Sequence, residues 1–254
     1  MLSIIIITRN TSYVVQQVIK SVKTFVDEIV VVQNEKIDRG KVDSPQTKEK
    51  IYYLPFENDF SKLRNFGISK AKNKWILVLD SDEQLSMELI EAIPSLIKDP
   101  HIDGYWFRRK TYISKVRYLR YGFFYPDYQL RLFRNKKEYR YVGAIHEQLT
   151  IPKERTKELP LDILHFPTNP KYTSWLDFKN MMPYIRIQAT ELQKRRFSIM
   201  QLFWLGCSSF WKLLFDGFIH GKGFLDGYAG FRAHVLFSLS ISAGYFLAWY
   251  KKIT

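Results

Sequence analysis

The sequence predicts an α/β fold, in which a mixed β-sheet carries flanking helices and is followed by a helical extension. Two runs of branched apolar residues, 3–8 and 28–33, are typical of strands buried on both faces, and a helical pattern separates them. Strand, helix, strand is the order of a parallel βαβ unit. Helical spacing of apolar residues returns from residue 171 onward, which predicts the extension.

Composition limits the classes of function. The 254 residues are 46% hydrophobic, enough for one domain with a sizeable core and an extension. The net charge of +14 indicates an anionic partner such as a nucleotide, an anionic lipid or a phosphorylated glycan. Nucleic acid is not expected, because the sequence carries no nucleic-acid-binding motif. The single cysteine, Cys207, suits a reducing compartment, and no signal peptide is expected at the N-terminus.

Polar residues stand at the ends of the first two predicted strands. Thr8, Arg9 and Asn10 follow the first strand, and Gln33 ends the second. Open α/β sheets bind ligands beyond the carboxyl ends of their strands, so these residues are candidates to contact a nucleotide. A plain strand-to-helix loop is the alternative. The absence of Gly-x-Gly-x-x-Gly after the first strand argues against a dinucleotide-binding dehydrogenase.

A third strand is predicted at 51–54, and a helix begins after it at Asp59 or Ser61. Lys62 and Arg64 fall in the first turn of this helix, where cations oppose the helix dipole. A diphosphate above the helix would explain their presence. Solvated side chains are the alternative.

The acidic segment after the next strand is the central chemical feature. An apolar run from Trp75 leads directly into Asp80-Ser81-Asp82-Glu83. Carboxylates about 4 Å apart repel by about 1 kcal/mol in water and by more near a protein surface. A Mg²⁺ or Mn²⁺ ion would offset this repulsion and join the carboxylates to substrate phosphates. An acidic turn that caps the next helix, predicted at 85–98, is the alternative.

Beyond residue 100 the pattern becomes alternating and rich in aromatic residues. It predicts antiparallel strands or hairpins added to the sheet at 104–114, 116–121, 128–134 and 139–145. Arg131 and Arg134 lie on opposite faces by strand parity, so one of them can serve a diphosphate while the other is a surface charge.

The residues from Asp59 to Glu83 resemble glycosyltransferase family 2. The resemblance is carried, in order, by Phe60-Ser61, Arg64-Asn65, Trp75-Ile76-Leu77 and Leu79-Asp80-Ser81-Asp82-Glu83. The segment is most similar to the branch containing lipopolysaccharide-core β-1,4-glucosyltransferases and bacteriocin S-glycosyltransferases. The resemblance covers roughly the first two thirds of the chain. It implies the Rossmann-like GT-A fold, a nucleotide-sugar donor and an Asp-x-Asp motif for a divalent metal.

The resemblance also implies a metal site. Asp82, with Asp80 nearby, would hold Mn²⁺ or Mg²⁺. His165, a late histidine at the end of a short strand, and His146 are the further ligand candidates. A core histidine bonded to backbone is the alternative for His165, and a structural histidine is the alternative for His146.

An inverting transfer needs a base that takes the acceptor proton. Glu147, in a His-Glu pair that this branch carries, is the first candidate and Asp127 the second. An ion pair with an arginine is the alternative for Glu147. The candidates for donor binding are Thr8, Arg9, Asn10, Gln33, Lys62, Arg64, Asp80, Ser81 and Arg131.

One segment departs from the family. The family usually has Asp-x-Gly-Ser-x-Asp after the second strand, and that aspartate contacts the base. This chain has Gln-Asn-Glu-Lys-Ile-Asp at 33–38. The loop therefore assigns no base contact, and the expectation of a UDP-sugar with a glucose-like hexose comes from the branch.

The tail combines aromatic residues at 197–218 with an apolar segment at 231–250 that ends in two lysines. The uninterrupted run at 235–250 falls short of the ~20 residues that span a bilayer, so we expect a helix in the headgroup layer. Core packing or homo-oligomer packing is the alternative. The segment 223–231 resembles the tail of the lipopolysaccharide-core branch, which favours a membrane-bound acceptor.

These features predict a catalytic domain at 1–170, with a nucleotide-sugar half at about 1–100 and an acceptor half at about 101–170. The remainder, 171–254, is predicted to associate with membrane or to oligomerise. The predicted reaction is metal-dependent, inverting hexosyl transfer from a UDP-sugar to a cell-envelope glycan or lipid-linked acceptor, as in lipopolysaccharide biosynthesis. It would take place in the cytoplasm at the inner face of the plasma membrane. A peptide or protein acceptor and a non-catalytic basic module binding lipid or nucleic acid are the alternatives.

Overall fold

The computed structural model describes residues 1–9, 13–35, 48–57, 59–143, 147–168 and 171–254. The chain forms two compact units. The first contains 1–109 and 128–165, and the second contains 110–127 and 166–254. The segment 110–127 thus belongs with the C-terminal helices, whereas the sequence placed it with the sheet.

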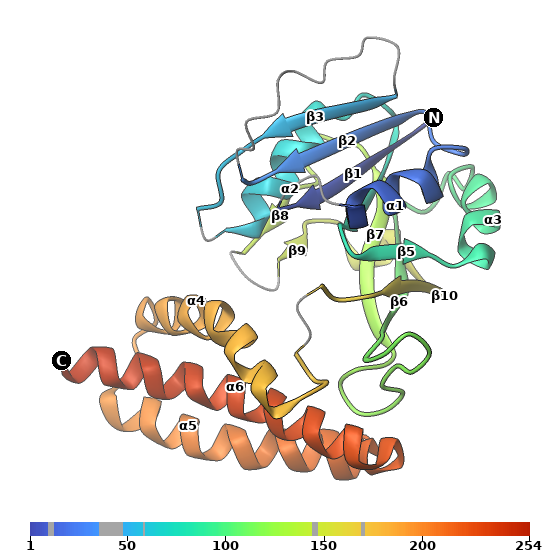
Figure 1. The fold of residues 1–254 in the computed structure, drawn as a ribbon. Coiled ribbons are helices and arrows are strands. Elements are labelled where there is room, and N and C mark those ends of the chain that lie inside the picture. Colours follow the sequence, from blue (N-terminus) through green and yellow to red (C-terminus); the bar gives the residue numbers. More distant parts are fainter. Residues whose placement is uncertain (10–12, 36–47, 58, 144–146, 169–170) are drawn as a thin grey trace. The chain divides into compact units, whose positions relative to one another are not determined.

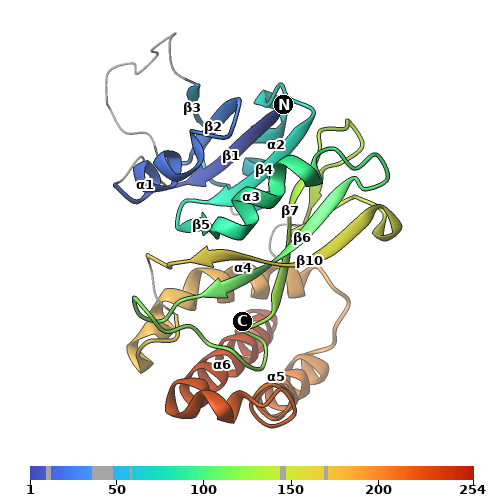
Figure 2. The same cartoon turned by 90° about the vertical axis from the view of Figure 1, so that its right-hand side faces the viewer.

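The first unit is built on one eight-stranded sheet with the order β3-β2-β1-β4-β7-β6-β10-β5. Strands β1 to β4 are parallel, whereas β7 runs antiparallel to β4, and β5 antiparallel to β10 (Figures 1 and 2). The strands are β1 (Leu2–Thr8), β2 (Glu28–Gln33), β3 (Glu49–Tyr53), β4 (Trp75–Asp80), β5 (Glu83–Leu85), β6 (Gly104–Thr111), β7 (Asp127–Arg134) and β10 (Thr156–His165). A separate two-stranded ladder pairs β8 (Tyr141–Val142) with β9 (Gln148–Leu149), and η1 (Lys153–Arg155) precedes β10.

Alternate residues of the central strand β1 point to opposite faces, and both faces are buried. Ile4 and Ile6 join the core on the side of helices α1 (Tyr13–Val22) and α3 (Met87–Leu96), while Ile5 and Ile7 join the core under α2 (Phe60–Lys70). A Cβ atom added to Gly67 of α2 would lie 2.5 Å from Cγ2 of Ile5, so glycine permits the close packing of α2 on the sheet. The predicted mixed α/β sheet with flanking helices is confirmed.

Local differences from the prediction have physical reasons. The helix expected from residue 85 begins at Met87, after its N-cap Ser86, because Glu83–Leu85 pairs with β10 instead. The strand expected at 116–121 is a loop with a single bridge between Tyr112 and Tyr118. Backbone N–H groups of this loop bond to a side chain of the helical unit rather than to a strand.

The second unit is helical. Its elements are η2 (Trp175–Met181), α4 (Met182–Gln193), α5 (Ile199–Leu214), the π-helical turn η3 (Phe215–His220), η4 (Gly223–Asp226) and α6 (Gly227–Ile253). Helix α6 packs against both α4 and α5, with Ala189, Leu202 and Ala248 buried between them. The hydroxyl of Ser242 on α6 donates a hydrogen bond of 2.6 Å to the carbonyl of Gly206 on α5.

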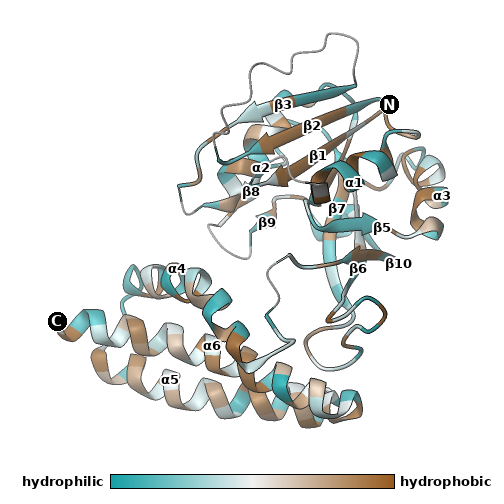
Figure 3. Ribbon diagram, viewed as in Figure 1, coloured by the Kyte–Doolittle hydropathy of each residue, from teal (hydrophilic) through white to brown (hydrophobic). Residues whose placement is uncertain are grey.

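Large apolar side chains of this unit are exposed. Hydrophobic residues recur along the ribbons of α5 and α6 (Figure 3). Two helical stretches, Ile199–His220 of 22 residues and Gly223–Ile253 of 31 residues, are long and apolar enough to cross a membrane by length and composition alone. Their most apolar windows are 17% and 39% buried. Helix α6 is longer than the apolar run expected at 235–250, because Arg232 and His234 lie within one continuous helix.

Candidate active site at the carboxyl ends of the parallel strands

Strand register brings several predicted site residues to one edge of the sheet. Thr8 pairs with Gln33, and Ile7 pairs with Asp80. Since β1, β2 and β4 are parallel, their last residues Thr8, Gln33 and Asp80 lie at the same carboxyl edge. Thr8 and Gln33 are buried, and the backbone N–H of Ser81 donates to the carbonyl of Ile7 at 3.1 Å. This edge is where an open α/β sheet binds its ligand.

Behind this edge lies a network of buried ion pairs. The carboxylate of Asp80 accepts hydrogen bonds from Arg64 at 3.0 Å and from Arg131 at 2.9 Å. Arg131 also donates to Glu83 at 2.7 Å, and both side chains of that pair are almost completely buried. Burial raises the pKa of Asp80, but the guanidiniums of Arg64 and Arg131 outweigh it and hold that pKa well below its usual range. The network is therefore ionised at neutral pH.

Glu83 is a member of this network that sequence reasoning missed as a site residue. Its side chain is fully buried, and its carboxylate also accepts the backbone N–H of Asp80 at 3.0 Å. The carboxylate thus closes the turn that follows β4. The signal for it was present, because a third acidic residue stands immediately after the Asp-x-Asp motif.

Arg64 also joins the motif to the predicted base. Its Nε donates to Oε1 of Glu147 at 2.7 Å, while its Nη2 binds Asp80. The neighbouring Asn65 bonds through its side-chain amide to both the N–H and the carbonyl of Tyr141, at 2.9 and 2.8 Å. Helix α2 therefore positions Glu147 directly and β8 through Asn65. Glu147 thus forms an ion pair with an arginine, which the sequence analysis gave as the alternative to a role as base.

Three donors in this cluster are buried without a hydrogen-bond partner in the described part of the chain. They are Nη1 of Arg64, Nε of Arg131 and the hydroxyl of Tyr141. An unsatisfied buried donor costs about 1–3 kcal/mol, and more when it is charged. The arginine side chain of Arg64 also lies over the ring of Tyr141, at 5.4 Å from its centroid. A polar or anionic ligand at this point would satisfy these groups.

Asp82 lies beside His165, with Oδ1 and Nε2 3.5 Å apart. Asp82 lies in the turn just before β5, and His165 of β10 pairs with Glu83, the first residue of β5. A carboxylate oxygen and an imidazole nitrogen are suitable donors for Mn²⁺ and related cations. Among the described residues no group of three or more His, Cys, Asp or Glu side chains could hold a metal ion. The pair fits a cation whose remaining ligands come from substrate and water.

Two of the remaining candidates, both described, make ion pairs apart from this cluster. Lys62 is exposed and pairs with Glu57 at 2.7 Å, and Arg9 is exposed and pairs with Glu35. Asn10 and His146 lie outside the described residues. Asp127 belongs to the second unit.

Comparison with known proteins decides the family. The sequence model of Glycosyl transferase family 2 matches residues 3–156, which is more than half of the chain. The chain belongs to glycosyl transferase family 2. The GT-A fold inferred from the resemblance is confirmed.

Several curated proteins resemble this family 2 chain. It is 31% identical over 146 residues to a TPR repeat-containing protein of Synechococcus elongatus, covering 57% of this chain and 34% of that protein. An uncharacterized glycosyltransferase of Rickettsia bellii is 29% identical over 146 residues, covering 57% and 49%. The SPbeta prophage-derived glycosyltransferase SunS of Bacillus subtilis is 28% identical over 163 residues, covering 63% and 36%. The chain thus spans about a third to a half of the length of these relatives.

Solved structures of S. aureus TarS are also similar to this family 2 chain. The complex of TarS 1-349 with UDP-GlcNAc has a TM-score of 0.46 and 16% identity, covering 78% of this chain and 68% of that one. The complex with UDP has a TM-score of 0.47 and 14% identity, covering 100% and 92%. These values are too low to support an argument about substrates.

Proposed function

We propose that this family 2 glycosyltransferase transfers a hexose from a UDP-sugar, with inversion, to a cell-envelope glycan or a lipid-linked acceptor. The observation that carries the proposal is Arg64, which connects the Asp-x-Asp motif to Glu147 at the ligand-binding edge of the sheet. The first unit would carry the reaction, and the second would hold the enzyme at the membrane.

Donor binding is assigned to the arginines of the buried network. Arg64 and Arg131 each keep one buried N–H without a partner among the described residues. A diphosphate offers oxygen acceptors that guanidinium groups bind strongly. Binding it would satisfy the unpaired donors and bring charge to the carboxyl edge, where Thr8 and Gln33 also lie. Lys62 and Arg9 are less suited to this role, because each pairs with an exposed glutamate.

Glu147 is assigned as the base that accepts the proton of the attacking hydroxyl. Arg64 binds its Oε1 and so fixes the orientation of the carboxylate. Within the described chain Oε2 has no hydrogen-bond partner, which leaves it for the acceptor. Direct displacement by that hydroxyl inverts the anomeric centre. A base in this role typically contributes 10²–10⁴-fold to the rate.

Asp82 and His165 are assigned as the protein ligands of a divalent metal. When bound, such a cation neutralises charge on the departing nucleotide diphosphate. Both oxygens of Asp80 are bound by arginines, so Asp80 is assigned to the ion-pair network and not to the metal. The 3.5 Å between the Asp82 and His165 donors supports this pair, since two ligands about 2.1 Å from one cation lie roughly 3 Å or more apart.

Peripheral binding to an anionic membrane is assigned to the second unit. Trp204, Trp211 and Phe215 are exposed on one continuous helix with a mixed aromatic and aliphatic surface. Lys251 and Lys252 end the last helix. Exposed aromatic residues suit the membrane interface, and nearby lysines each contribute about 1 kcal/mol toward anionic lipid.

The experiment is a donor screen on the full chain. Released nucleotide is measured for UDP-, GDP- and other activated sugars with Mn²⁺, with Mg²⁺ and with chelator. We expect metal-dependent release that is fastest for one UDP-hexose and accelerates with a lipid-linked acceptor. Donor binding without metal dependence, transfer or hydrolysis would contradict the proposal and favour a non-catalytic module. Preference for a GDP-sugar would contradict the donor assignment alone.

A further inference from the structure

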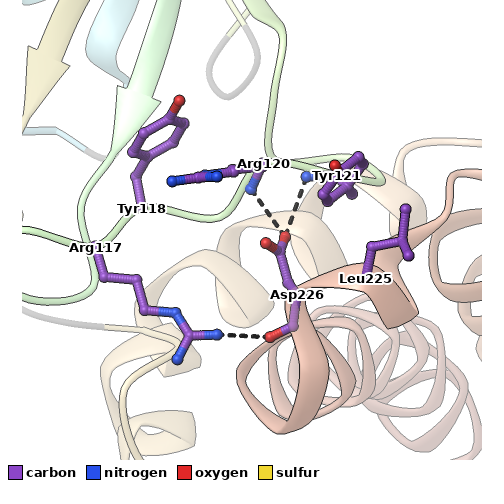
Figure 4. A pocket seen from close by; sticks show the side chains of 6 residues that line it. All are labelled: Arg117, Tyr118, Arg120, Tyr121, Leu225 and Asp226. Carbon is purple, nitrogen blue, oxygen red and sulfur yellow. Dashed lines mark hydrogen bonds between the residues drawn. The ribbon is translucent and has the colours of Figure 1, made fainter.

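The second unit contains a pocket of its own, of about 300 Å³ (Figure 4). It lies where the loop 110–127 meets the start of α6. Its lining residues are Arg117, Tyr118, Arg120, Tyr121, Leu225 and Asp226. The first four come from the loop and the last two from the turn before α6.

Hydrogen bonds to the buried residue Asp226 connect the two segments that line the pocket. The carboxylate of Asp226 accepts the backbone N–H groups of Arg120 at 2.8 Å and Tyr121 at 3.1 Å. The carbonyl of Asp226 accepts Nη2 of Arg117 at 2.7 Å. These bonds join residues more than 100 positions apart in the sequence. The frame therefore persists when the side chain of Arg120 is changed.

The charge of the pocket is positive. Its lining carries two guanidiniums and one carboxylate, and that carboxylate already accepts two backbone N–H donors. Arg120 makes no ion pair with any described residue, and its guanidinium lies 5.5 Å from the ring centroid of Tyr118. Asp226 also does not cap α6 with its side chain, so the positive end of this 27-residue helix adds to the field. Forked guanidinium donors match the geometry of a phosphate.

Exposed apolar side chains accompany the pocket in the turn that leads into α6. Leu225, which lines the pocket, is 54% exposed, and its near neighbours in the sequence, Phe224 and Tyr228, are 48% and 63% exposed. A water-soluble phosphate would leave these side chains uncovered, whereas the chains of a lipid would cover them. We propose that this pocket binds the phosphate group of a lipid. The site lies within the helical unit and does not depend on the transfer reaction, so a binding assay tests it separately.

The test compares vesicles of equal surface charge with the full-length protein. One set contains phosphatidic acid in phosphatidylcholine, and the other contains phosphatidylserine adjusted to the same measured zeta potential. We expect tighter binding to the phosphomonoester set. Arg120→Gln should remove this preference and weaken binding to phosphatidic acid by about tenfold, as expected for losing a charge-assisted hydrogen bond. Arg196→Gln is the matched control, because Arg196 is an exposed arginine of the same unit outside the pocket.

Two further measurements complete the test. Leu225→Asp places a carboxylate at the exposed rim and should also remove the preference without loss of folding. Glycerol phosphate should compete weakly, and short-chain phosphatidic acid should compete at least tenfold more tightly. Equal weakening by Arg120→Gln and Arg196→Gln would overturn the proposal in favour of general charge attraction. An unchanged preference in Leu225→Asp would overturn the site, and equal competition by the two soluble phosphates would overturn the lipid assignment.

Discussion

The two units of this family 2 chain differ in how they bury charged and apolar residues. In the first unit, apolar strand residues are completely buried on both faces of the sheet, and charged residues such as Glu83 and Arg131 are buried with them as ion pairs. In the second unit, large apolar side chains including Trp204 and Trp211 are 62% and 69% exposed. The first unit thus pairs its buried charges with one another, whereas the second leaves large apolar side chains exposed.

This difference separates two kinds of specificity. A buried ion pair is costly unless its geometry is good, so we expect the arginine network to hold its side chains in fixed positions. An exposed apolar surface larger than isolated side chains marks an interaction site. Substitutions in the first unit should therefore change turnover or stability. Substitutions on the surface of the second unit should change binding to membranes. The predictions below test that separation, beginning with the largest effect.

Asp82→Asn should reduce transfer by about 10³-fold or more, because the variant loses a ligand for the cation that offsets several kcal/mol of charge on the leaving group. The thermal unfolding midpoint should stay the same, since Asp82 lies outside the buried arginine network. Turnover and Mn²⁺ binding by calorimetry are the measurements. An unfolded variant, or one with wild-type turnover, would remove Asp82 from the metal site.

Glu147→Gln should lower turnover at saturating donor by 10²–10⁴-fold, the range typical for the loss of a general base. Donor affinity should change little, because the amide oxygen of glutamine can still accept the hydrogen bond from Nε of Arg64. Glu57→Gln is the control, since Glu57 is exposed and pairs with Lys62. Weaker donor binding with preserved turnover would instead place Glu147 among the donor contacts, and full activity would favour Asp127.

Glu83→Gln should destabilise the first unit by about 3–5 kcal/mol, because it leaves the guanidinium of Arg131 buried without one of its counter-ions. The exposed pair offers a direct contrast: Glu57→Gln should cost no more than about 1 kcal/mol. Denaturant midpoints at constant slope measure both. A small effect of Glu83→Gln would mean that the network is not rigid.

The double change Trp204→Ser and Trp211→Ser should weaken binding to anionic vesicles by about tenfold, since partial burial of each indole contributes on the order of 1 kcal/mol. Turnover on a water-soluble acceptor should not change. Val116→Ser, at a position 88% exposed in the same unit, is the control. Binding that survives the double change would assign the aromatic surface to protein packing and favour a soluble acceptor.

Mild acid should affect the second unit before the first. Burial lowers the pKa of His234 and outweighs its hydrogen bond to the carbonyl of Gly230. The unfolded chain therefore takes up a proton first as pH falls below about 6.5, and stability declines by up to about 1.4 kcal/mol per pH unit. The lowered pKa of Asp80 acts in the same direction but only below about pH 4.

Hydrogen exchange between pH 7 and pH 5 should show the loss of protection in α6 and not in β1 or β4. His234→Asn should flatten this pH dependence, whereas His220→Gln, at an exposed histidine, should leave it unchanged. Parallel loss of protection in both units would contradict the assignment to His234.

Features with a local sequence signal were predictable. The apolar runs that became β1, β2 and β4 could be recognised from residue type and length alone. Helix α6 was underestimated because its polar residues were taken as interruptions. The structure buries His234 and Ser238 inside the helical unit, and Arg232 donates to the carbonyl of Tyr172.

The sequence predicted the position of the candidate site at the edge of the sheet, but few of the contacts between its side chains. Topology alone brings Thr8, Gln33 and Asp80 to one edge. The sequence treated Lys62 and Arg64 alike, although a two-residue offset on a helix turns one to solvent and the other into the core. The Arg64–Glu147 pair spans 83 positions, and no local pattern encodes a contact at that separation.

The path of the chain has a consequence for how this enzyme can be divided or recombined. The chain passes between the two units three times, after residues 109, 127 and 165. Leu119 and Phe124 of the inserted loop share a buried cluster with Ala229 and Ala233 of α6. Truncating the chain after residue 170 would therefore leave the loop without the helix that covers its apolar residues. A genetic exchange that gave the enzyme a new helical unit would have to transfer two separate stretches of coding sequence together.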